Sequence, residues 1–133
     1  MGELIYPLTL IGPEGKATLD ALVDTGATFT WAPADTLRAL GVPSLGEESF
    51  SLANGQVVDY DLGAVTVRIN GKERPVVCVF GDEGSQPLIG VTTLENLLLI
   101  VDPIGQRLVP RPANLKAGRG LRGGLCPGGG RAW

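Results

Sequence analysis

The chain has 133 residues, of which 44% are hydrophobic, and this is enough for one domain with a modest core. It contains no histidine, which excludes Ser-His-Asp and Cys-His catalysis and the usual zinc sites, so carboxylates remain for acid–base chemistry. The net charge is −3, and residues 113–133 hold four basic and no acidic residues, so residues 1–112 carry −7. The net negative charge of residues 1–112 argues against a nucleic-acid-binding domain.

Neither a membrane segment nor a cofactor site is expected. The apolar run at 97–101 is far shorter than the ~20 residues that a membrane helix needs. The N-terminus lacks the basic and apolar segments of a signal peptide, so the sequence predicts a cytoplasmic protein without membrane contact. Cys78 and Cys126 form no disulfide framework and no metal spacing, and we expect neither a metal nor another cofactor. Cys78 lies in a strand-like run and is interpreted as a core residue rather than a nucleophile.

A first hairpin is predicted to end at a carboxylate. Residues 3–11 and 16–23 have strand patterns on either side of a Gly-Pro turn, and the second arm leads straight into Asp24. Gly26 then predicts a sharp turn. A carboxylate at the mouth of a buried strand needs amide donors, a cation, or a second carboxyl group that shares its proton. An ordinary Asp-x-Gly turn or an Asp helix cap is the alternative.

The next segment contains a tryptophan and a short helix. Trp31 falls seven residues after Asp24, and both a core position and a pocket position remain open for it. Residues 33–40 predict a helix, because Pro33 suits its first turn and Gly41 suits its end.

Two Asn-Gly pairs between alternating segments predict hairpins. Asn54-Gly55 stands between residues 49–53 and 56–61, and Asn70-Gly71 follows a further strand at 64–69. A buried strand, which includes Cys78, is expected after the second turn and before a polar loop.

The last structured part combines a short strand, a helix and a hairpin. Leu88-Ile89-Gly90 predicts a strand whose glycine lets two backbones approach closely, and a helix should follow at 92–98. Thr92 or Thr93 is expected to cap that helix. Residues 99–110 predict a final hairpin.

The C-terminal segment, residues 113–133, is expected to be a disordered tail. It holds seven of the twenty glycines and has almost no apolar periodicity. The predicted organisation is therefore one folded domain at 1–112 and a Gly/Arg-rich tail at 113–133.

These motifs together resemble the aspartic proteases. Residues 24–27, Asp-Thr-Gly-Ala, resemble the catalytic loop, and the alanine is similar to the retropepsin branch. Trp31 and Pro33 stand at the offsets found after the catalytic Asp of pepsin-like enzymes, and residues 88–90 resemble the second structural motif of the half-barrel. The resemblance covers residues 3–110. It implies an all-β, retropepsin-like half-barrel of antiparallel hairpins, with a flap hairpin and one or two short helices, that closes as a symmetric homodimer.

The resemblance also implies an activity. Aspartic protease chemistry needs two carboxyl groups that share a proton, and this chain has one Asp-Thr-Gly motif. It therefore implies an endopeptidase in which Asp24 of two chains activates a water, with a peptide or protein as substrate. Thr25 would bind the opposite loop, and Gly26 would allow the close approach of the two loops.

Further roles follow from the same resemblance. The implied flap and substrate-binding residues are Ala53, Asn54, Gly55, Gln56 and Trp31. The implied second structural motif is Leu88, Ile89 and Gly90. Ala27 has no hydroxyl to donate to the carboxylate, which indicates a less acidic working pH than in pepsin-like enzymes. Thr28 stands where retropepsins often have an acidic residue, so the substrate contacts of that residue do not carry over.

Two alternatives to an enzyme remain. The same fold can serve as a non-catalytic peptide-binding or dimerisation module, because fold does not fix function. The basic tail can also recruit a partner into a larger complex.

Overall fold

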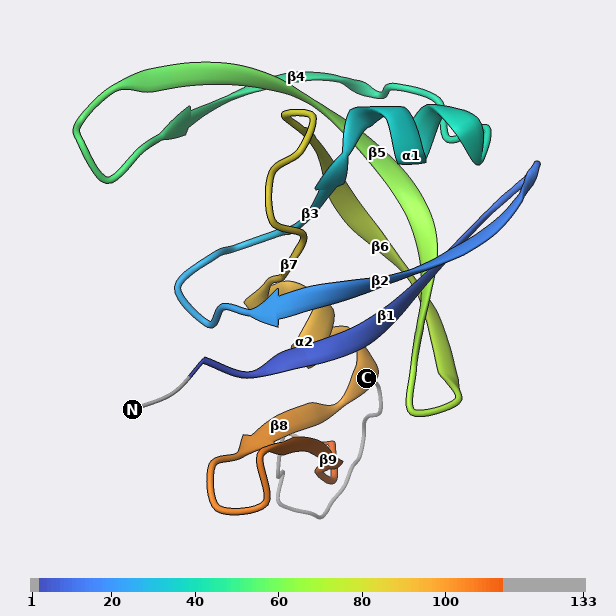
Figure 1. Ribbon diagram of the computed structural model, residues 1–133, viewed down its shortest axis with the longest axis vertical. Helices are drawn as coiled ribbons and strands as arrows, with labels where there is room; N and C mark the ends of the chain where they lie inside the picture. The colour runs from blue at the N-terminus through green and yellow to red at the C-terminus, as the bar shows by residue number, and fades with distance from the viewer. Residues whose placement is uncertain (1–2, 114–133) are drawn as a thin grey trace, which may run out of the picture.

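The structure, a computed structural model, describes residues 3–113 and is mostly strand, as the sequence predicts (Figure 1). The strands are β1 (Ile5–Gly12), β2 (Gly15–Val23), β3 (Thr30–Pro33), β4 (Gly46–Ser51), β5 (Val57–Ile69), β6 (Lys72–Gly81), β7 (Leu88–Ile89), β8 (Leu99–Asp102) and β9 (Arg107–Pro110). The helices are α1 (Ala34–Ala39) and α2 (Val91–Leu97). Apart from Ala113, the expected tail lies outside the described residues. Within residues 3–113, neither helix has the length or the apolar character needed to cross a bilayer.

Seven strands form one curled sheet. Their order is β1-β2-β7-β3-β6-β5-β4, and β1 also pairs with β5, which brings the two sides of the sheet together. The short strand β7 lies between β2, to which it is parallel, and β3, to which it is antiparallel. Strands β8 and β9 form a separate two-stranded sheet beneath the main one in Figure 1. This insertion of β7 is what places residues 88–90 behind the loop that follows β2.

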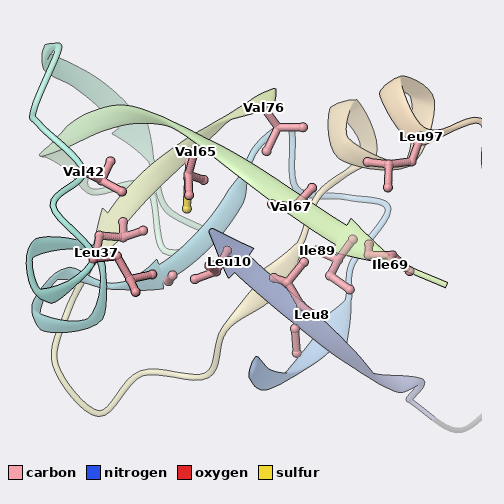
Figure 2. Packing of buried hydrophobic residues seen from close by; sticks show 14 of the residues in the cluster. Leu8, Leu10, Leu37, Val42, Val65, Val67, Ile69, Val76, Ile89 and Leu97 are labelled. Atoms are coloured by element: carbon pink, nitrogen blue, oxygen red, sulfur yellow. The ribbon is translucent and has the colours of Figure 1, made fainter. Parts of the chain in front are cut away.

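The core lies inside the curled sheet, and Figure 2 shows its packing. Alternate residues of β1 and β5 point inward, as the two-residue period of a strand requires. Helix α1, strand β7 and helix α2 each add a fully buried side chain. The inward residues from these elements are Leu8, Leu10, Val65, Val67, Ile69, Leu37, Ile89 and Leu97.

Cys78 is part of this core. It is fully buried in β6, and its burial raises the pKa of the thiol to about 12. The thiol is therefore protonated and unreactive at neutral pH, which confirms the interpretation of Cys78 as a core residue.

The predicted hairpins are present, with one difference. Strand β5 runs without a break through residues for which the sequence predicted two strands, 56–61 and 64–69. Gly63 does not interrupt it, because this glycine keeps its place in the ladder opposite Cys78 of β6. A Cβ at position 63 would lie 2.8 Å from the side chains of Phe80 and Val42, so the close packing there favours glycine. The second turn has positive φ angles at Asn70 (54°) and Gly71 (80°), as a tight Asn-Gly hairpin turn requires.

Asn70 also connects this turn to the rest of the molecule. Its Oδ1 accepts a hydrogen bond from the hydroxyl of Tyr6 (2.8 Å), and its Nδ2 donates to the carbonyl of Leu108 (3.0 Å). The β5–β6 turn thereby holds both β1 and β9.

We expect Asn70→Gly to lower the free energy of unfolding by about 1–2 kcal/mol, because glycine keeps the positive φ but loses both hydrogen bonds. Urea unfolding measures the change. The matched control, Tyr6→Phe, removes one of the two bonds and should cost less. An Asn70→Gly variant as stable as the wild type would mean that packing alone holds β9.

Candidate active site

The loop after β2 holds Asp24 in a fixed position. The amide of Asp24 donates to the carbonyl of Ile89 (3.0 Å) on β7. The amide of Gly26 donates to Oδ1 of Asp24 (2.9 Å), and the amide of Ala27 donates to the main-chain carbonyl of Asp24 (3.1 Å). The half-buried carboxylate thus has one amide donor in a tight loop, which is one of the arrangements that the sequence left open.

The second half of the loop, residues 27–28, is hydrogen-bonded to the start of α2. The amide of Val91 donates to the carbonyl of Ala27 (2.8 Å). The carbonyl of Thr28 accepts two bonds from Thr92, one from its amide (3.1 Å) and one from its hydroxyl (2.7 Å). These bonds fix the loop from behind.

The prediction that Thr92 or Thr93 caps α2 is wrong. The N-cap residue is Gly90, and no side chain donates or accepts a capping bond there. Both threonines have other partners, because the Thr92 hydroxyl binds the loop and Thr93 is buried against Thr30. The predicted close approach at Gly90 is confirmed: a Cβ there would lie 2.4 Å from the carbonyl carbon and oxygen of Phe29.

An open cavity of about 420 Å³ lies between this loop and the β4–β5 hairpin. Figure 1 shows the hairpin and the loop after β2 projecting to the same side of the molecule. The lining residues come from the loop, the end of β4 and the hairpin turn after it, and strands β3 and β7. They are Asp24, Gly26, Ala27, Thr28, Phe29, Trp31, Phe50, Ser51, Leu52, Ala53 and Leu88.

Aromatic rings form one wall of this cavity. Trp31 of β3 contacts Phe50 of β4 edge to face, with ring centres 5.3 Å apart, and Phe50 also lies 6.3 Å from Phe29. Behind them, the ring of Tyr60 lies 4.8 Å from Trp31, and its hydroxyl donates to Asp82 (3.0 Å). Desolvation and the neighbouring Asp82 carboxylate raise the pKa of Tyr60. Trp31 is half-buried, so it serves both the packing under the hairpin and the wall of the cavity.

The cavity brings together only part of the predicted site. The predicted residues that line it are Asp24, Gly26, Ala27, Thr28, Trp31, Ala53 and Leu88. The others lie elsewhere: Thr25 lines two other grooves, Asn54, Gly55 and Gln56 form the exposed hairpin tip, and Ile89 and Gly90 are buried behind the loop.

Four lining residues were not predicted from the sequence. They are Phe29, Phe50, Ser51 and Leu52. The alternation of residues 49–53 contained the signal for two of them, because Phe50 and Leu52 must point to the same face of a strand.

The cavity can support acid–base chemistry by a carboxyl group. Among the described residues that line it, Asp24 is the one ionisable residue, and the remaining wall is mainly apolar. Within residues 3–113, no group of three or more His, Cys, Asp or Glu side chains is placed to hold a metal ion.

Comparison with known proteins agrees with this geometry. The sequence profile of the aspartyl protease family matches residues 8–93, so the chain belongs to that family. Its fold is retropepsin-like, as the sequence resemblance predicted. A search of curated proteins found no match.

Solved structures show the same fold at low sequence identity. The retroviral protease-like domain of Ddi1 from Leishmania major is 18% identical, with a TM-score of 0.57 over 86% of this chain and 92% of that one. The EIAV protease complexed with the inhibitor HBY-793 is 15% identical, with a TM-score of 0.53 over 72% and 88%. The simian foamy virus protease is 17% identical, with a TM-score of 0.50 over 68% and 90%.

Proposed function

We propose that residues 1–112 form an aspartic endopeptidase that works as a symmetric homodimer, with Asp24 of each chain in one catalytic pair. One observation carries the proposal: Asp24 lies in the open cavity beneath the β4–β5 hairpin and is, within residues 3–113, the one ionisable group that lines it. Hydrolysis by this class of enzyme needs a second carboxyl group, and a second copy of the chain supplies it most simply.

The two carboxyl groups share one proton and divide the work. The ionised carboxylate takes a proton from the attacking water, and the protonated carboxyl donates to the carbonyl oxygen of the peptide bond, which stabilises the developing oxyanion. The hydrogen bond from the Gly26 amide holds Oδ1 of Asp24 during these steps. The carboxyl group that took the proton from water then donates it to the nitrogen of the tetrahedral intermediate, the C–N bond breaks, and the amine leaves.

The surface beside Asp24 has apolar grooves that suit an interface with a second copy of the chain. Thr25 is exposed and lies at the edge of two grooves, of about 280 and 560 Å³. Both grooves are largely apolar and include Val101 of β8, and the neighbouring Ile100 is 46% exposed. In the described part of the chain, the β8–β9 hairpin pairs with no third strand. A partner that covers these features would bring its own Asp24 to the same axis.

We expect Ile100→Asp to raise the dissociation constant of the dimer by about tenfold or more, because it places a charge in an apolar interface. Sedimentation over a range of concentrations measures it. The control is Leu45→Asp: Leu45 is 65% exposed and precedes β4, far along the chain from these grooves. Equal dissociation constants for both variants would remove this face from the interface.

The cavity favours an extended peptide as substrate. Such a peptide would run between Asp24 and residues 50–53, with a large apolar side chain against the rings of Phe29, Trp31 and Phe50. The direct test is cleavage of a mixed peptide library between about pH 3.5 and 7, with and without pepstatin. Pepstatin-sensitive cleavage supports the enzyme. No cleavage by a confirmed dimer would instead support a peptide-binding module on this fold.

A further inference from the structure

Two threonine side chains are buried directly behind the catalytic loop. Within residues 3–113, Thr30 and Thr93 are the two polar residues that are buried, each with 0% exposure. Their Oγ1 atoms lie 2.6 Å apart, and the Oγ1 of Thr30 also accepts a hydrogen bond from the amide of Gly90 (3.1 Å). A buried hydroxyl without a partner costs free energy, so two hydroxyls here call for an explanation.

The threonine pair contacts Gly90, whose two neighbours in the chain are hydrogen-bonded to the loop. Ile89 accepts the bond from the amide of Asp24, and Val91 donates to the carbonyl of Ala27. Gly90 lies between these two residues, and its amide is held by the hydroxyl of Thr30. The bonds at Ile89 and Val91 join backbone to backbone. Of these three neighbouring bonds, the one at Gly90 depends on a side chain. A shift of Gly90 would move the two attachment points on either side of it.

We propose that Thr30 and Thr93 are positioning residues, which fix Gly90 and thereby the position of the Asp24 carboxylate. Neither threonine lines the cavity, so neither touches a substrate there. Thr93 orients the hydroxyl of Thr30, and Thr30 binds the glycine amide. This inference rests on the proposed protease function for its kinetic consequence but not for its structural one.

The two hydroxyls have unequal roles, which makes the proposal specific. Thr30→Val removes the acceptor of the buried Gly90 amide and also leaves Thr93 without its partner. Thr93→Val leaves the acceptor in place. Thr30→Ser keeps the acceptor and loses one methyl group. The expected order of damage is therefore Thr30→Val, then Thr93→Val, then Thr30→Ser.

The kinetic test uses a peptide substrate. We expect Thr30→Val to lower kcat about 10–100-fold with KM changed by less than about threefold, because a small misplacement of a catalytic group is costly while the cavity wall is unchanged. Thr30→Ser should stay within about threefold of the wild type. The matched control is Thr9→Val, which breaks the exposed hydroxyl pair between Thr9 and Thr18 (2.9 Å) on β1 and β2. Unchanged kcat in Thr30→Val would overturn the proposal.

A second test needs no activity. Amide hydrogen exchange should show that Thr30→Val lowers the protection of the Asp24 and Val91 amides by about tenfold or more, while amides of the β5–β6 hairpin keep theirs. Equal losses across the whole protein would mean a merely structural role and overturn the proposal, as would unchanged protection at Asp24. If the wild type cleaves nothing, the protease proposal fails, and the exchange pattern still decides whether the pair positions the loop.

Discussion

Replacing Asp24 with Asn should abolish peptide cleavage while leaving the fold and the dimer intact. The expected loss in kcat is about 10²–10⁴-fold, the usual contribution of a positioned acid–base group. The asparagine side chain has the same shape and can still accept the bond from the Gly26 amide, but it neither takes a proton from water nor donates one as a carboxyl group. The chain has no histidine, so no imidazole can take over the proton transfer.

The matched control for this variant is Asp20→Asn. Asp20 is an exposed carboxylate on the same strand, β2, and it lines none of the three grooves near the loop. Its replacement should leave the rate unchanged. Cleavage by Asp24→Asn at the wild-type rate would mean that another group carries the chemistry and would exclude the proposed mechanism.

Replacing Gly90 with Ala should damage the fold more than any surface change. The added Cβ would lie 2.4 Å from the carbonyl carbon and oxygen of Phe29 and 3.0 Å from the carbonyl oxygen of Ala27. These are backbone atoms, so no rotamer change relieves the overlap, and the loop must move away from β7. We expect the free energy of unfolding to fall by about 3 kcal/mol or more, with loss of activity in whatever remains folded. Urea unfolding measures the loss.

A buried glycine elsewhere in the sheet provides the comparison. Gly81 ends β6, and a Cβ there would lie no closer than 3.3 Å to a neighbouring atom, the carbonyl oxygen of Ala32. Gly81→Ala should therefore cost far less than Gly90→Ala. Equal losses in the two variants would show that the requirement for glycine at position 90 is not steric.

Some of the site could be predicted from the sequence because it depends on local backbone rules. Asp24 comes at the end of an apolar strand and precedes a glycine turn, and Gly90 follows two apolar residues, so both positions follow from strand length and glycine geometry. The β4–β5 hairpin follows from alternation and an Asn-Gly pair. None of these inferences needs a contact between distant parts of the chain.

The remainder depends on contacts between distant segments. Thr93 looks like a helix cap in the sequence, but 63 residues separate it from Thr30, whose hydroxyl it meets in the core. Phe29 and Phe50 become one wall only because the hairpin folds over the loop. Likewise, β5 stays unbroken at Gly63 because this residue pairs with Cys78 of β6, a partner that lies 15 positions further along the chain. Tertiary packing decides these features, and a single sequence does not display it.

Mixing wild-type chains with Asp24→Asn chains tests the central claim most directly, namely that two copies of Asp24 form one site. The total chain concentration is kept constant above the dimer dissociation constant, and the cleavage rate is followed as the wild-type fraction falls. If each active dimer needs two Asp24 residues, the rate falls with the square of that fraction, to about one quarter in an equal mixture. A rate that falls in proportion, to about one half, would mean that each chain works alone and would contradict the shared pair.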